Sequence, residues 1–468
     1  MSDATPHTKP KLLVILGAGS SVELGMPSVG GLAKSMKESA SGWASELAER
    51  FDDAPVPDYF DLVWKNREKA MKQQNGAGWK SALEPNYERC LGDLHALMNG
   101  TLPSLRWASH SRALCRMVGI SGRGHTQKRA VSSEVNSLLK DLLRKLEKCF
   151  RERCVEFECE NGRQRSAEFE CYCAFVAALR ARFDLGVYNL NHDTVALTAL
   201  GNIFTGFARP TGCFEAAEVQ SRREWEFLYH LHGSVHFSLG RAEKEDEHIP
   251  ASYDICWLAD LEDGPCGQHR SVWLSTGSSD NRDVVASTLV AGGWKLDQLQ
   301  TEPFQTFYST LPRHAHEADA ILIAGYGFGD EHVNSVLKNV LQAREGHRPP
   351  VMVLDFLKPE KRPLEGERSK GYEFVERTQS RWQSDVLTKL GMWDGVATLR
   401  HDFRRAKRLD QPLAEAEYAE EVRSEEYAVF FENAYPVAVW FGGFLAAADP
   451  GEEIANWLLG HVPGRSGM

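Results

Sequence analysis

Short apolar runs closed by glycine or polar residues recur along the chain, and they predict buried strands. A compact apolar run with such a boundary is typical of a strand that is buried on both faces of a sheet. The segments are Leu12–Leu16, Leu185–Leu190, Phe227–Leu231, Ala320–Ala324 and Val351–Leu354, with Ser271–Leu274 as a candidate sixth. Helical patterns separate several of them, which indicates crossover connections. We therefore expect an α/β protein with a parallel sheet and helices on both faces.

The segment between the first two predicted strands is far longer than one crossover helix requires, so it predicts a large helical insertion. Its clearest element runs from Val135 to Phe150, where apolar residues recur at helical spacing and form one face. We expect an α/β domain in two parts, residues 1–48 and 181–357, with the helical insertion at 49–180 between them. Residues 358–468 are predicted to form a helical C-terminal region.

The predicted C-terminal region is rich in aromatic residues, which suit either a core or a subunit interface. These residues are Tyr427, Phe430, Phe431, Tyr435, Trp440, Phe441, Phe444 and Trp457. The sequence leaves both interpretations open.

The net charge of −11 gives no general attraction to nucleic acid, so such binding would need a local basic patch. One candidate accompanies the long helical pattern. It consists of Lys140, Arg144, Lys148 and Arg151, with Arg123, Lys128 and Arg129 just upstream. A solvated helix face and a docking surface for an acidic partner or nucleic acid both fit this pattern, so direct nucleic-acid binding stays open.

The cysteine pattern and the apolar segments favour a cytoplasmic protein. The ten cysteines contain no C-x-x-C pair, which argues against a zinc ribbon and a disulfide framework, and we expect no zinc. The N-terminus lacks the apolar core of a signal peptide. The longest uncharged apolar run, 436–448, is too short to span a bilayer, so no membrane association is expected.

A glycine-rich turn directly follows the first predicted strand. Gly17-Ala18-Gly19-Ser20-Ser21 lies where a strand should lead into a helix, an arrangement typical of a Rossmann-like dinucleotide-binding turn. The glycines allow close backbone approach, and the helix N-terminus is expected to offer free N–H groups to a pyrophosphate. Val22 replaces the third glycine of the common G-x-G-x-x-G pattern, so a glycine turn without a ligand is the alternative.

Polar motifs also follow the second, third and fourth predicted strands. They are 189–194 (NLNHDT), 230–234 (HLHGS) and 325–330 (GYGFGD). Ligands of parallel sheets bind beyond the carboxyl ends of the strands, so these motifs are candidate site residues. As alternatives, Asn-x-Asp is a common turn or helix cap, His232 a packed polar residue, and Asp330 the N-cap of the following helix.

The four motifs in this order resemble the sirtuin superfamily. Gly17-Ala18-Gly19 and Gly25-Met26-Pro27 are similar to its cofactor-binding loop, Asn191-x-Asp193 to its asparagine–aspartate motif, and His232-Gly233 to its catalytic His-Gly. The deacetylase pattern is incomplete. Ser28-Val29-Gly30 replaces Asp-Phe-Arg, and the two C-x-x-C pairs are missing. The Gly-Tyr-Gly-Phe-Gly-Asp motif is similar to that of bacterial sirtuin-like antiphage-defence proteins that hydrolyse NAD⁺.

The resemblance implies an NAD⁺ glycohydrolase with NAD⁺ as its substrate, and the residue types suit that reaction. Nicotinamide is a good leaving group, so positioning and electrostatics can replace a protonating carboxylic acid at the oxocarbenium-like transition state. The expected catalytic residues are Asn191, which can hydrogen-bond a ribose hydroxyl, the carboxamide or water, and His232, which can accept a proton. Asp193 is expected either to stabilise positive charge or to brace its loop. The expected cofactor-binding residues are Gly17, Ala18, Gly19, Ser20, Ser21, Pro27, Gly325, Gly327 and, at the adenosine end, Asp355.

Three other functions stay open. His230 and His232 alternate onto one strand face and could join Asp193 around a metal ion in a hydrolase. NAD-dependent protein deacylation would need an acyl-lysine channel. A non-catalytic nucleotide-binding regulatory module would bind ligand without turnover.

A constitutive NADase would poison its own cell, so we also expect control. The helical insertion and the C-terminal region are the expected places for it. The resemblance to defence proteins implies that a homo-oligomer, or a defence-system partner such as a ring-forming ATPase, would supply this control.

Overall fold

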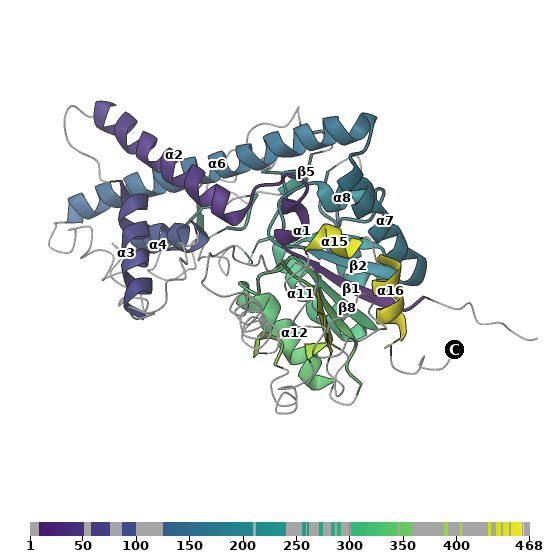
Figure 1. Cartoon of the computed structure of the whole chain (residues 1–468). Helices are drawn as coiled ribbons and strands as arrows, with labels where there is room; N and C mark the ends of the chain where they lie inside the picture. The colour runs from purple at the N-terminus through teal and green to yellow at the C-terminus, as the bar shows by residue number, and fades with distance from the viewer. Residues whose placement is uncertain are drawn as a thin grey trace, which may run out of the picture.

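The computed structural model describes residues 9–50, 58–74, 87–99, 125–208, 212–239, 255–258, 260–261, 271–274, 282–285, 288–291, 299, 301–344, 347–356, 388–391, 403–404, 429–431, 437–440, 443–448, 451–460 and 462. Its centre is a sheet of eight strands in the order β10-β11-β12-β9-β8-β1-β2-β3 (Figure 1). The strands are β1 (Lys11–Leu16), β2 (Asp184–Asn189), β3 (Phe227–His230), β8 (Ala320–Ala324), β9 (Val351–Leu354), β10 (Phe403–Arg404), β11 (Val429–Phe431) and β12 (Val437–Trp440). From β12 to β3 every neighbouring pair is parallel, whereas β11 is antiparallel to both of its neighbours, β10 and β12.

The five strands predicted from apolar runs all lie in this sheet, and a Rossmann-like α/β fold is confirmed. The candidate sixth strand exists as β6 (Ser271–Leu274), but it pairs with β7 (Arg282–Val285) in a separate ribbon. A second ribbon pairs β4 (Phe237–Leu239) with β5 (Ile255–Trp257).

Helices cover both faces of the sheet, because alternate residues of the buried strands point to opposite sides. Leu12 and Val14 of β1 belong to one core cluster, and Leu13 and Ile15 belong to the other. The first cluster is shared with α2 (Val29–Arg50), α3 (Tyr59–Gln74), α4 (Tyr87–Asn99), α6 (His125–Arg163), α7 (Ala167–Arg182), α8 (Val195–Leu200), α15 (Phe444–Ala448) and α16 (Gly451–Gly460). The second is shared with α9 (Ala216–Ser221), α11 (Phe304–Glu317) and α12 (Glu331–Ala343). The short α1 (Gly19–Val22) follows β1.

The helix α6 joins the helical part of the chain to the sheet. Its 39 residues span about 58 Å at 1.5 Å per residue. Figure 1 shows one half of α6 packed with α2, α3 and α4 away from the sheet, and the other half crossing towards α1 and α8. The predicted apolar face from Val135 to Phe150 is buried, as expected. The division into domains stays a prediction.

The basic residues predicted along α6 do not share one exposed face. Arg144 and Lys148 are exposed, whereas Arg151 is buried. Arg151 pairs with Glu147 at 2.9 Å and donates to Leu261 O at 3.3 Å, so its charge is used in contacts inside the protein. Arg123 and the side chains of Lys128 and Arg129 lie outside the described residues.

The C-terminal region is not purely helical, contrary to our expectation, because it adds β10, β11 and β12 to the sheet. The run Val437–Trp440 is too short to show a helix or strand period, and pairing with β9 makes it a strand. Trp440, Phe444 and Trp457 are buried, which makes these three aromatic residues core rather than interface. The other predicted aromatic side chains of this region lie outside the described part.

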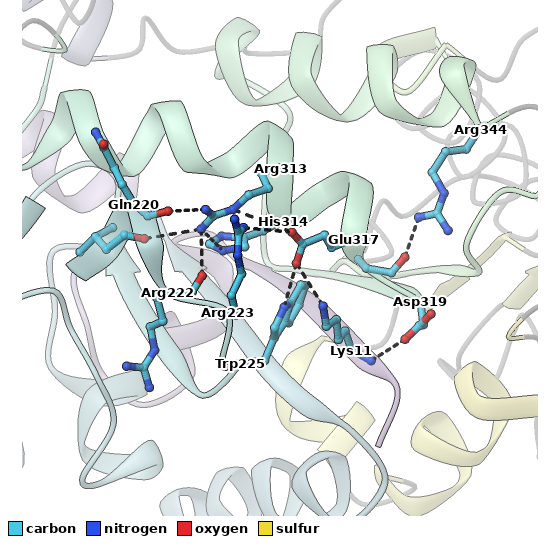
Figure 2. A network of polar contacts seen from close by, with 12 residues as sticks. Lys11, Gln220, Arg222, Arg223, Trp225, Arg313, His314, Glu317, Asp319 and Arg344 are labelled. Carbon is cyan, nitrogen blue, oxygen red and sulfur yellow. Dashed lines mark hydrogen bonds and ion pairs between the residues drawn. The ribbon is translucent and has the colours of Figure 1, made fainter. Parts of the chain in front are cut away.

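A polar network closes the amino-terminal edge of the sheet (Figure 2). Arg313 of α11 donates to the carbonyls of Val219, Gln220 and Arg222, which end α9. The same guanidinium lies 3.0 Å from His314 Nε2, and Tyr188 Oη lies 2.7 Å from His314 Nδ1. An arginine can only donate, so His314 Nε2 accepts and the ring is neutral. Burial, assisted by the charge of Arg313, lowers the pKa of His314 to about 3.

This network predicts that the protein loses stability in mild acid. Below about pH 6.5 the unfolded chain binds a proton at His314, but the folded chain does not until about pH 3. The free energy of unfolding should therefore decrease as the pH is lowered through this window. The decrease is at most about 1.4 kcal/mol per pH unit for this residue. Urea unfolding from pH 7.5 to 5.0 measures the slope, and His314→Gln should reduce it. Equal slopes for both proteins would contradict the prediction.

Candidate active site

The loops after β1 and β8 lie in direct contact. Gly17 N donates to Ala324 O and Gly19 N donates to Gly325 O, both at 2.9 Å. A Cβ on Gly17 would lie 2.6 Å from Gly325 O, and one on Gly19 would lie 2.8 Å from Gly325 Cα. The strand order reverses between β1 and β8, so this contact lies at the switch point where open α/β sheets bind ligands.

The first N–H groups of α1 are used within the protein, whereas we expected them to be free. The N–H of Gly19 is used in the loop contact, and Ser20 N donates to Gly17 O at 2.9 Å. The following helix α1 has only four residues. Gly17, Gly19 and Gly325 thus allow two loops to approach each other, while exposed Ala18 and Gly19 leave one side of the turn open.

The side chain of Asn191 is held at the glycine turn by hydrogen bonds. Its Nδ2 lies 3.0 Å from Gly17 O, 3.2 Å from Ser20 Oγ and 3.3 Å from Ser21 Oγ. A carbonyl can only accept, so the bond to Gly17 O fixes the amide orientation. Asn191 Oδ1 is left buried without a hydrogen-bond partner among the described residues. It is an acceptor that a hydroxyl or a water can satisfy.

Both carboxylate oxygens of Asp193 accept hydrogen bonds from other groups of the protein. One carboxylate oxygen accepts from Ser21 Oγ at 2.6 Å, and the other accepts from Val195 N at 3.1 Å, at the start of α8. Burial raises the pKa of Asp193, and the two hydrogen bonds oppose that rise. These contacts match the bracing role that the sequence left open, since they tie the loop after β2 to the glycine turn.

His232 follows β3 and pairs with Asp330. The β2–β3 register places His230 beside Asn189, so Asn191 and His232 each lie two residues beyond the paired ends of these neighbouring strands. His232 Nε2 lies 2.7 Å from Asp330 Oδ2, and both side chains are buried. Asp330 Oδ1 also accepts from His332 N and Val333 N, which confirms the predicted N-cap of α12. No pattern in the sequence indicated the contact between His232 and Asp330.

The remaining predicted residues lie at the same edge with less defined roles. Gly327 is exposed, and a Cβ there would meet nothing within 4 Å, so this glycine leaves room for a ligand. Pro27 and Asp355 are half-buried. Asp355 Oδ1 accepts from Phe356 N at 2.8 Å, within its own turn.

His230, His232 and Asp193, which were considered for a metal site, each have other contacts in the structure. His230 is buried against Phe237 and Trp257, and burial lowers its pKa to about 3. No group of three or more potential ligands that could hold a metal ion occurs among the described residues.

The cysteines within the described ranges are all free thiols. None of the described helices is both long and apolar enough to cross a membrane.

Two distant parts of the chain hold the site loops from outside. From α6, Arg153 donates from Nε and Nη2 to Gly25 O at 3.2 and 3.1 Å, and Glu158 accepts from Thr194 Oγ1 at 2.7 Å. From the C-terminal region, the N–H groups of Phe444 and Leu445 donate to Glu23 Oε2 at 2.8 and 2.9 Å. The sequence pointed to these regions but not to these contacts.

The parallel sheet with two loops meeting at its switch point is an open α/β arrangement in which ligands bind at the carboxyl ends of the strands. A family model described as the SIR2-like domain matches residues 186–375. Residues 186–375 are therefore similar to SIR2-like domains, and domains of that kind bind NAD. The match starts within β2, and β1 with its glycine turn joins the matched part by pairing with β2 and β8. No curated protein matches the chain.

The loop contact predicts that two nearby glycine substitutions differ in their effect on stability. Gly325 has a φ of +62°, and a Cβ there would lie 2.1 Å from Ser20 N. Gly325→Ala should therefore destabilise the protein by at least about 1–3 kcal/mol from backbone strain alone. Gly327→Ala, where the space is open, should leave the melting temperature unchanged. Thermal unfolding followed by circular dichroism compares them, and equal melting temperatures would refute the contact.

Proposed function

We propose that this chain is an NAD⁺ glycohydrolase, which converts NAD⁺ to nicotinamide and ADP-ribose, and that it acts as an antiphage-defence effector through NAD⁺ depletion. One observation carries the catalytic part. Asn191 Oδ1 is a buried acceptor without a partner among the described residues, fixed beside the glycine turn and next to the strand end that bears His232. Buried acceptors are nearly always satisfied in native proteins, which supports a ligand hydroxyl or water at this atom.

The reaction needs little chemistry from the protein. The oxygen of water bonds to the ribose carbon, the bond to nicotinamide breaks, and the proton of the water passes to a base. Asn191 would accept a hydrogen bond from a ribose hydroxyl or orient that water, and His232 would accept the proton. A site shielded from bulk solvent makes both interactions stronger.

The departures from the deacetylase pattern favour hydrolysis over protein deacylation. Ser28-Val29-Gly30 stands where deacetylases have Asp-Phe-Arg, and the chain lacks both C-x-x-C pairs. The Gly-Tyr-Gly-Phe-Gly-Asp motif, which is similar to that of defence NADases, supports the defence role.

Substitution of either catalytic residue tests the activity. Asn191→Ala and His232→Ala should each lower nicotinamide release by at least about 100-fold, because each removes a group that acts on the reacting atoms. Chromatography of NAD⁺, nicotinamide and ADP-ribose over time measures release, and circular dichroism controls for folding.

The products discriminate the other functions. Acyl-ADP-ribose formed from an acylated peptide would indicate a deacylase. NAD⁺ binding without turnover by the wild-type protein, in the presence of every candidate activator, would indicate a non-catalytic module. Unchanged release by folded His232→Ala would overturn the assignment of the base.

We also propose that the site is held closed until a partner or assembly releases it. Asn191, Asp193 and His232 are only 6, 2 and 6% exposed, so a movement of the surrounding loops would increase the access of a dinucleotide to them. Arg153 holds Gly25 from α6, and Glu23 is held by the start of α15. The other half of α6 packs with α2, α3 and α4 away from the sheet, where a partner or a second copy could dock and move it.

This control predicts a gain of activity in a tether variant. Arg153→Ala removes the hydrogen bonds to Gly25 O, so it should raise the rate of nicotinamide release measured without activator by several-fold. Lys148→Ala is the matched control, because Lys148 lies on the exposed side of α6 and pairs with Glu152. A rate for Arg153→Ala at or below that of the control would contradict the tether.

A further inference from the structure

The sheet order makes the contact between His232 and Asp330 a long-range bridge. His232 follows β3 and Asp330 follows β8, and β1 and β2 lie between these strands. At about 4.8 Å between neighbouring strands, the two segments start about 14 Å apart. They meet above the ends of β1 and β2, where the glycine turn and Asn191 lie.

The loop that carries Asp330 is held firmly. Tyr326 Oη accepts from Asp330 N at 3.1 Å and lies 2.9 Å from Asp330 O and 3.0 Å from Asn334 Oδ1. Asn334 Nδ2 donates to Phe328 O at 2.9 Å. The helix cap and these hydrogen bonds together fix the direction in which the Asp330 carboxylate points.

We propose that Asp330 is the positioning residue of His232, and that it holds the imidazole with its proton on Nε2. The 2.7 Å contact then runs from Nε2–H to a carboxylate that can only accept. This tautomer leaves Nδ1 as the lone-pair nitrogen, so Nδ1 is the atom that accepts the proton. The imidazolium that results is stabilised by the neighbouring carboxylate. The catalytic part of this inference rests on the proposed NAD⁺ hydrolysis.

Asp330→Asn separates this role from the helix cap. Asparagine caps a helix about as well as aspartate, so the bonds to His332 N and Val333 N can persist. An amide Nδ2 facing His232 Nε2 would donate instead of accept, which favours the opposite tautomer with the proton on Nδ1. We expect kcat for nicotinamide release to fall by at least about 100-fold with little change in KM.

Ser166→Ala is the matched control for lost capping. Ser166 Oγ caps α7 by accepting from Phe169 N, and it contacts neither His232 nor Asp330. It should lower the melting temperature without lowering kcat. Asp330→Ser is a second variant, because serine keeps the capping oxygen but cannot reach the ring as a charged acceptor. Its kcat for nicotinamide release should also be lower than that of the wild type.

Nitrogen chemical shifts of the histidine rings give a readout that needs no activity. In full-length protein with ¹⁵N-labelled histidine, the His232 signals are those that His232→Gln removes. The wild type should show protonated Nε2, and Asp330→Asn should show protonated Nδ1. The same tautomer in both proteins would overturn the inference, as would normal kcat in Asp330→Asn. If the wild type releases no nicotinamide, the proposed function fails while the shifts still decide the role of Asp330.

Discussion

The close approach of the loop after β8 to the loop after β1 is the constraint on which the site depends. Gly325 lies where any side chain would collide with Ser20 N, and Gly17 and Gly19 lie against the Gly325 backbone. Because the two loops touch, the carbonyl of Gly17 is fixed, and Asn191 Nδ2 binds to it. The buried orientation of Asn191 Oδ1 therefore follows from a packing contact between glycines.

Polar side chains complete the site by linking the carboxyl ends of four parallel strands. Asp193 binds Ser21, which ties the loop after β2 to the turn after β1. His232 binds Asp330, which ties the loop after β3 to the loop after β8. Each bond joins segments that are far apart in the chain, so the site forms only when the sheet has assembled. Buried pairs of this kind are costly when one partner is lost, which keeps the arrangement specific.

Two parts of the chain outside the parallel strands contact the loops of the candidate site. α6 contacts the loops after β1 and β2 through Arg153 and Glu158, and its other half packs with α2, α3 and α4. The C-terminal region contacts α1 through Glu23 and also supplies β12 next to β9. A movement in either part would act directly on the loops that enclose Asn191.

Local pattern was sufficient for the buried strands, the apolar face of α6 and the N-cap of α12, because apolar period and capping chemistry are properties of neighbouring residues. It also identified Asn191 and His232 as candidates, since polar residues at strand ends can be read along the chain. The tertiary structure alone decided that Val437–Trp440 is a strand, that Arg151 is buried, and that the glycines pack against each other. It also decided that Asp330 reaches His232, because strand order sets which loops meet and no local pattern encodes that order.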